Sequence, residues 1–125
     1  RNPFYDRYAY WYRYDLDEKY LDREAKAYVG KYDYSGFCSS KSVVEDTVRE
    51  IYSFDVWREG NLVLFKVSGD GFLYNMVRIM VGTLLFVSQG KIKENELKSV
   101  IDSKDRKRAG RTAPPQGLYL NKIVY

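Results

Sequence analysis

Residues 72–87 have the sequence FLYNMVRIMVGTLLFV, and this almost uniformly apolar run decides how the rest of the chain is interpreted. It is shorter than the ~20 residues that a membrane-spanning helix needs, and Asn75, Arg78 and Thr83 interrupt it. The run therefore predicts a helix buried in the core of a globular protein.

Arg78 is the anomaly in this run. A helix over residues 72–87 has no polar face wide enough for a charge, and neither Asn75 nor Gly82, three and four positions away, is acidic. A buried guanidinium without an anion costs several kcal/mol. We therefore expect its carboxylate to come from elsewhere in the fold, from a ligand, or from outside this chain.

Composition excludes several kinds of chemistry. The 125 residues are expected to form a single domain over residues 1–125, with a net charge of +4 that permits a nucleic-acid partner. The chain contains no histidine, which removes His-paired nucleophiles and His-ligated zinc. The single cysteine, Cys38, is expected to be an inert, small apolar residue in a reducing cytoplasm. No cofactor or metal is implied.

Periodicity predicts the remaining elements. Tyrosine-rich residues 4–14 indicate a strand, and residues 18–29 a helix with Asp17 as N-cap and Gly30 just beyond its end. Residues 32–43 are expected to be irregular. Residues 47–57 and 62–68 alternate as two strands of a hairpin around Gly60. Gly90 closes the apolar helix. A short helix over 94–103, a basic loop to residue 116 and a strand over 117–125 complete the chain.

The order of these elements is β-α-β-β-α-(α)-β. That order predicts an α+β, ferredoxin-like fold: an antiparallel sheet with helices on one face. Because many unrelated functions share this fold, it does not identify one.

Two stretches are more specific than the fold. They are GDGFLYNMVRIMVG at residues 69–82 and AGRTAPPQGLYL at residues 109–120. Together they resemble the C-terminal half of the bacterial tRNA pseudouridine synthase A family, whose members isomerise uridines in the tRNA anticodon stem-loop. The opening residues 1–4 (RNPF), residues 35–38 (SGFC) and residues 47–51 (TVREI) are also similar to this family.

The resemblance implies roles for particular residues. Arg78 matches the arginine that forms an ion pair with the catalytic aspartate, which would supply its missing carboxylate. Val77 and Leu118 match apolar positions expected to line the uracil pocket, and Phe72 and Tyr74 are further candidates. The resemblance also implies half of a pseudouridine synthase fold, no cofactor, tRNA as partner, a homodimeric full-length protein and no membrane.

One departure from the family pattern matters. The catalytic aspartate of the family lies in an Arg-Thr-Asp segment of the N-terminal half, whereas here Arg111-Thr112 is followed by Ala113. The aspartate is needed to attack the base or ribose before the base rejoins through carbon. The chain is therefore expected to lack the N-terminal half and to be inactive alone.

Each candidate also has a structural alternative. Arg78 could bridge helix and sheet through carbonyls, Asp55 or Asp70, although Asp70 is better explained as a helix N-cap. Leu118 could be only a strand residue that packs in the protein core. Four basic residues suit contacts with RNA phosphates, but cations are also stabilised near a helix C-terminus. They are Arg106, Lys107, Arg108 and Arg111.

Three functions remain open at this point. The favoured one is half of a cofactor-free RNA isomerase, with Arg78 facing an empty cleft. A non-catalytic RNA-binding module instead predicts an internal partner for Arg78. A dimerisation module predicts an exposed apolar patch of several hundred Å².

Overall fold

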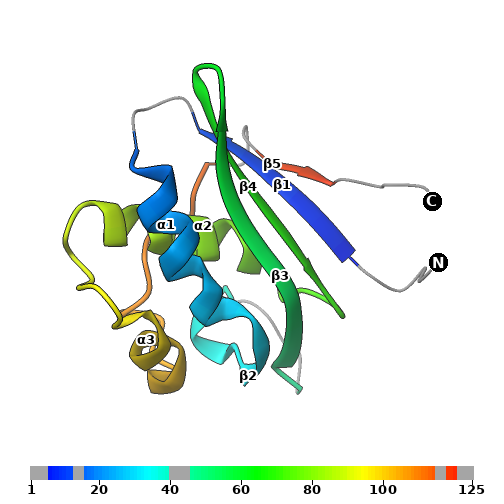
Figure 1. The fold of residues 1–125 in the computed structure, drawn as a ribbon. Coiled ribbons are helices and arrows are strands. Elements are labelled where there is room, and N and C mark those ends of the chain that lie inside the picture. Colours follow the sequence, from blue (N-terminus) through cyan, green and yellow to red (C-terminus); the bar gives the residue numbers. More distant parts are fainter. Residues whose placement is uncertain (1–5, 13–15, 40–45, 115–117, 121–125) are drawn as a thin grey trace.

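The computed structural model describes residues 6–12, 16–39, 46–114 and 118–120. Five strands and three α-helices follow one another along these segments (Figure 1). In chain order they are β1 (Asp6–Tyr12), α1 (Glu18–Ala25), β2 (Gly30–Asp33), β3 (Val48–Glu59), β4 (Leu62–Gly69), α2 (Met76–Ser88), α3 (Leu97–Ser103) and β5 (Leu118–Leu120). Two 3-10 turns, Lys26–Tyr28 and Ser35–Phe37, flank β2.

The strands form one sheet in the order β2-β3-β4-β1-β5, and every neighbouring pair is antiparallel. β1 and β3 both run antiparallel to β4, which lies between them, so they run parallel to each other, and the connection between them contains α1 and β2. This is the split βαβ arrangement, with the helices on one face of the sheet (Figure 1). The predicted α+β, ferredoxin-like fold is confirmed.

An additional edge strand, β2, was not predicted. Residues 32–43 were expected to be irregular, but Gly30–Asp33 pairs with β3, with Gly30 opposite Ile51 and Asp33 opposite Val48. Four residues are too few for a period-2 pattern to stand out, and the pairing depends on a strand distant in sequence. Of the rest of that stretch, residues 40–43 lie outside the described residues.

An aromatic cluster fills the core between the sheet and the helices. Tyr28, Tyr34, Phe37 and Phe54 are almost completely buried, and the ring centroids of Tyr28 and Phe54 lie 4.9 Å apart. The hydroxyls find acceptors inside the core: that of Tyr28 donates to the carbonyl of Met80 at 2.8 Å, and that of Tyr34 to the carbonyl of Tyr28 at 2.6 Å. Burial of each hydroxyl is therefore compensated.

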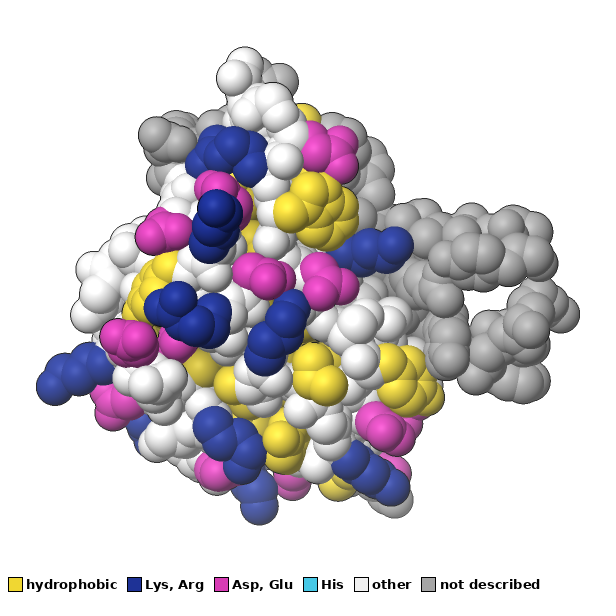
Figure 2. Space-filling model, viewed as in Figure 1, with side chains coloured by type: hydrophobic (Ala, Val, Ile, Leu, Met, Phe, Trp, Pro, Cys, Tyr) yellow, Lys and Arg dark blue, Asp and Glu magenta, His cyan; other side chains and the backbone are white. Residues whose placement is uncertain are grey.

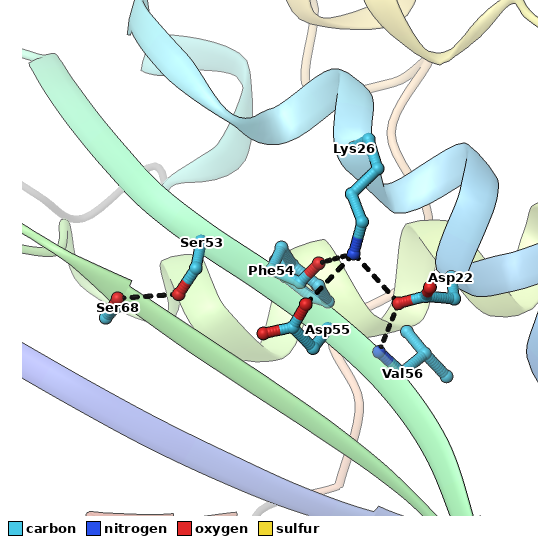
Figure 3. A network of polar contacts seen from close by, with 7 residues as sticks. All are labelled: Asp22, Lys26, Ser53, Phe54, Asp55, Val56 and Ser68. Atoms are coloured by element: carbon cyan, nitrogen blue, oxygen red, sulfur yellow. Dashed lines mark hydrogen bonds and ion pairs between the residues drawn. The ribbon is translucent and has the colours of Figure 1, made fainter.

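A polar network fastens α1 to β3 (Figure 3). The Asp17 carboxylate caps α1 as predicted, accepting from the Tyr20 amide. One turn further, the Asp22 carboxylate accepts from the Val56 amide at 2.8 Å and from the Lys26 ammonium at 2.9 Å. The α-helix ends at Ala25 and continues as a 3-10 turn to Tyr28. The helical conformation therefore ends one residue before the predicted limit at residue 29.

The apolar helix begins four residues later than predicted. α2 starts at Met76 because Asn75 has a φ of 61°, in the left-handed region that Asn tolerates. The prediction that Asp70 caps this helix was wrong. Its carboxylate accepts from the Glu50 amide at 2.9 Å and so fastens the end of β4 to β3.

α3 is also shorter than predicted, since it begins at Leu97 rather than at residue 94. Asn95 has a φ of 66°, and its amide donates to the buried carboxylate of Glu24 on α1 at 2.8 Å. This bond holds the preceding turn in a non-helical conformation. Within the described part of the chain, no helix is long and apolar enough to cross a membrane.

Candidate active site around Arg78

Arg78 lies in the first turn of α2 rather than in the middle of a buried helix. Its side chain is half-buried, which corrects the expectation that the helix offers it no access to solvent. The physical reason is the late start of α2: residues 72–75 are not helical, so the end of the helix, and not its centre, carries the charge.

Two neutral acceptors hold the guanidinium of Arg78. Its Nε donates to the carbonyl oxygen of Ala113 at 2.8 Å, and its Nη1 donates to Oδ1 of Asn75 at 3.0 Å. Neutral acceptors fix the orientation of the group without balancing its charge. Among the described residues, no further hydrogen bond occupies Nη2.

Neither carboxylate that the sequence offered as an internal partner contacts Arg78. Asp55 pairs with Lys26 at 3.0 Å, and Asp70 binds the backbone of β3. Among the side chains that the structure describes, no acidic group lies within ion-pair distance of Arg78. The site is therefore a fixed cation without a counter-ion in this part of the chain.

The segment over residues 109–113 lies directly against α2. The Ala113 amide donates to the carbonyl of Arg78 at 3.0 Å, so these two residues bond in both directions. Further along the segment, the Gly110 amide donates to the Thr83 hydroxyl at 2.8 Å. The crossing is so close that a Cβ on Gly82 would lie 1.6 Å from the carbonyl oxygen of Arg111. Glycine at position 82 is therefore required by the contact.

The four predicted pocket residues have different surroundings. Val77 is 5% exposed and belongs to the main apolar core, and Phe72 is half-buried against that core. Tyr74 is 60% exposed, one residue before the Asn75 that binds Arg78. Leu118 lies in β5, opposite Tyr10 of β1, and its side chain lies outside what the structure describes. Of the three described side chains, Tyr74 is the most exposed and Val77 is buried.

The predicted RNA-binding residues also separate into groups. Lys107 and Arg111 are exposed. Arg108 is exposed and reaches the carbonyl and hydroxyl of Ser99 at 3.5 and 3.3 Å. Arg106 is half-buried and donates to the Gly110 carbonyl and the Thr112 hydroxyl of its own loop. On the face drawn in Figure 2, basic and acidic side chains are interspersed.

The sequence did not reveal Asn75, Thr83 and Ala113 as parts of the site. Ala113 acts through its backbone, so its side chain gives no signal. Asn75 and Thr83 looked only like interruptions of an apolar run. The signal that could have found them is their position within the two motif stretches at residues 69–82 and 109–120.

The fold and this site define a class: an α+β protein with a split βαβ sheet, in which a helix-borne arginine is held by a second, distant motif. The sequence model of the tRNA pseudouridine synthase family matches residues 25–125. The chain belongs to the tRNA pseudouridine synthase family.

Individual relatives agree with this assignment. The chain is similar to tRNA pseudouridine synthase A of Geobacillus sp. (strain WCH70), with 46% identity over 100% of this chain and 50% of the relative. It is also similar to tRNA pseudouridine synthase A of Acetivibrio thermocellus, with 47% identity over 94% of this chain and 48% of the relative. The chain thus spans about half the length of these curated relatives.

A solved structure of a Cbf5-Nop10-Gar1 complex contains a chain of similar shape. The match covers 67% of this chain and 26% of that one, with a TM-score of 0.49 and 20% sequence identity. The family assignment does not depend on it.

Proposed function

We propose that this chain is part of a tRNA pseudouridine synthase, and that it supplies one wall of the active-site cleft. In this proposal the complete protein isomerises uridine to pseudouridine in the tRNA anticodon stem-loop, in the cytoplasm. Membership of the family supports the activity. The observation that carries the role of this chain is the guanidinium of Arg78, fixed by Asn75 and Ala113 and lacking a carboxylate among the described residues.

The geometry suits Arg78 to orient a carboxylate. The bonds at Nε and Nη1 hold the guanidinium of Arg78 in one orientation, and its remaining N–H groups can donate to an anion. We propose that this anion is the catalytic aspartate, contributed by the N-terminal half of the complete protein. A neighbouring guanidinium keeps such a carboxylate ionised, as a nucleophile requires.

The proposed chemistry begins at the carboxylate. It attacks the base or ribose of the target uridine, and the N1–C1′ bond breaks. The base then rejoins the sugar through C5, the bond to the carboxylate breaks, C5 loses its proton to solvent, and N1 is protonated. Arg78 contributes charge and orientation to this sequence and forms no covalent bond. We therefore propose that these 125 residues do not turn over alone.

The test is release of tritium from tRNA that carries 5-tritiated uridine. The chain is assayed alone and after addition of a separately prepared N-terminal half. We expect no release from the chain alone and release from the mixture. The mixture with Arg78→Gln should be inactive, whereas Lys93→Gln, a charge change on an exposed side chain before α3, should remain active. Release by the chain alone would overturn the proposed role of Arg78.

We propose that Lys107, Arg108 and Arg111 contact RNA phosphates, since all are exposed on one loop beside the segment that holds Arg78. Replacing one cation that contacts a phosphate should reduce the slope of log binding constant against log salt by about 0.7–0.9. Filter binding of tRNA to the reconstituted protein over a range of salt concentrations measures this slope. A slope unchanged in all three glutamine variants would contradict the proposal.

A non-catalytic RNA-binding or dimerisation module is the alternative function. An RNA-binding module requires an internal partner for Arg78, and the partners found are the neutral Ala113 carbonyl and Asn75 amide, which would satisfy a purely structural arginine. Inactivity of the mixture together with retained tRNA binding would favour it. The homodimer expected for the complete protein is likewise a proposal, to be tested by light scattering.

A further inference from the structure

We propose that Arg106 is a positioning residue for Arg78 rather than an RNA contact. It acts through the segment over residues 110–113, which it holds in the conformation that binds Arg78. The functional meaning of this role rests on the proposed function of Arg78, but the structural role can be tested separately.

The guanidinium of Arg106 bridges two points of its own loop. Nη1 donates to the carbonyl oxygen of Gly110 at 2.8 Å, and Nη2 donates to the hydroxyl of Thr112 at 3.2 Å. The side chain is half-buried, whereas its neighbours Lys107 and Arg108 are exposed. A planar guanidinium that spans two acceptors fixes their separation, which a lysine cannot do with a single nitrogen.

The residue after Thr112 is Ala113, the main partner of Arg78. Its carbonyl accepts from Nε of Arg78 and its amide donates to the carbonyl of the same residue. Because residues 111–114 have no helical or strand hydrogen bonding of their own, other contacts must set their path. The Arg106 bridge ends one residue before the atom that orients Arg78.

The other end of the segment is fixed independently. The Gly110 amide donates to the Thr83 hydroxyl, which donates in turn to the carbonyl of Ile79 on α2. Gly110 is attached to α2 through Thr83, and Arg106 ties Gly110 to Thr112. Loss of Arg106 should loosen Thr112, and with it the position of the Ala113 carbonyl, while the Gly110 contact remains.

A phosphate contact is the competing role. Among the described side chains no carboxylate pairs with Arg106, so its charge would be open to an anion. Two of the five N–H groups of the guanidinium bind Gly110 and Thr112, so a phosphate would be bound by the others. The two roles predict different effects in a variant that lacks the guanidinium: positioning predicts faster exchange at Arg78, and a phosphate contact predicts a smaller salt dependence of tRNA binding.

The first measurement is hydrogen exchange of the Nε–H of Arg78 in the ¹⁵N-labelled chain, identified by its absence from Arg78→Gln. In Arg106→Gln and Arg106→Lys we expect exchange faster by about a factor of ten, the change that loss of one hydrogen bond of ordinary strength produces. The α2 amides of Val81 and Leu84 should be unaffected. Lys107→Gln, the matched control, should change none of these rates.

Unchanged exchange at Arg78 in Arg106→Gln would overturn the proposal. If Arg106→Gln loosens the whole fold, Thr112→Val takes its place, because it removes one acceptor of the bridge and leaves the guanidinium. Faster exchange at Arg78 in Thr112→Val, with steady core amides, supports the positioning role, and no change overturns it.

The second measurement uses the full-length protein. Arg106→Gln should lower kcat about ten-fold, matching the loss of one oriented bond, with KM for tRNA and the salt slope of binding unchanged. A slope reduced by about one unit, with exchange at Arg78 unchanged, would instead assign Arg106 to a phosphate. If the wild-type protein forms no pseudouridine, the proposed function fails while the exchange result still decides the role of Arg106.

Discussion

A cation in the first turn of a helix opposes the helix macrodipole, at a cost of about 0.3–1 kcal/mol. Arg78 occupies such a position in α2, and no acidic residue lies in that turn. Its bonds to Ala113 and Asn75 each contribute about 1 kcal/mol and offset this cost. An apolar residue at position 78 would remove both the electrostatic cost and the two stabilising hydrogen bonds.

The Arg78→Lys variant separates charge from geometry. Lysine keeps the positive charge but cannot bond Asn75 and Ala113 while also presenting paired donors to an anion. We expect the free energy of unfolding to fall by about 1 kcal/mol and single-turnover pseudouridine formation by the reconstituted protein to fall roughly 100-fold. Urea unfolding and quenched-flow assays measure the two effects. Wild-type activity in Arg78→Lys would show that a simple charge suffices.

Gly82 tests the contact between the two motifs. Its Cβ in Gly82→Ala would overlap the backbone of Arg111, which cannot move aside as a flexible side chain can. We expect a loss of about 2–3 kcal/mol in the free energy of unfolding, because overpacking against backbone displaces the segment. Urea unfolding measures this loss, and Ser88→Ala on the exposed end of α2 is the control. A loss below that of the control would mean that the segment repacks freely.

At this scale the sequence was informative about one residue of the site and silent about others. Arg78 was found because charge within an apolar run is conspicuous. Ala113 was not, because it contributes only a carbonyl and an amide. Asp70 was misassigned because a Gly-Asp-Gly turn before an apolar run resembles a helix cap, while its carboxylate actually serves β3.

The elements were predictable where periodicity was long. β3 and β4 alternate over many residues, and their hairpin at Gly60 was confirmed, with Glu59 opposite Leu62. β2 was missed because its pairing with β3 is not local. The start of α2 was misplaced because apolar residues at positions 72 and 73 pack against the core without being helical. An apolar run of residues indicates burial, but it does not by itself indicate a helix.

Attachment of α1 to β3 should depend on pH through Asp22. Burial alone would raise the pKa of Asp22, but the Val56 amide and Lys26 outweigh burial, so the pKa lies below the usual value of 3.8. A depressed pKa contributes stability above pH 3.8 that is lost as pH falls through the folded-state pKa. The free energy of unfolding of Asp22→Asn should therefore depend less on pH in the acid range than that of the wild type.

The corresponding experiment is urea unfolding of wild type and Asp22→Asn from about pH 6 to about pH 2.5. At the higher pH the variant should be less stable by about 1 kcal/mol, because the pair with Lys26 is partly exposed. The difference should shrink as the pH falls. Asp102→Asn, which removes an exposed pair within α3, is the control. A difference that stays constant with pH would contradict the assignment.

For the molecule as a whole, element order was enough to predict four of the five strands of the sheet and the face that the helices cover. A split βαβ unit leaves few ways to arrange antiparallel strands with helices on one side. Function did not follow from that arrangement, because the fold is shared widely. It followed from two motifs, at residues 69–82 and 109–120, that the fold brings into contact at Arg78 and Ala113.

The buried tyrosines make the whole molecule sensitive to alkali. Burial raises the pKa of Tyr28 and Tyr34 far above the usual 10.0, so both stay protonated in the folded core. In the unfolded chain they ionise near pH 10, and unfolding gains about 1.4 kcal/mol per pH unit above that for each tyrosine. The contribution of these two tyrosines to stability should therefore be level below pH 10 and fall steeply above it.

Tyr34→Phe tests this account because its two effects have opposite signs. Near neutral pH the variant should be less stable by about 1 kcal/mol, since the hydrogen bond to the Tyr28 carbonyl is lost. Above pH 10 it should lose stability less steeply, because one ionising group is gone, so the two urea-unfolding curves should converge and then cross. Tyr74→Phe, on a ring that is 60% exposed, should follow wild type throughout. Parallel curves for wild type and Tyr34→Phe would mean that Tyr34 ionises at the same pH in the folded and the unfolded chain. Burial of Tyr34 would then not be the cause of the loss of stability in alkali.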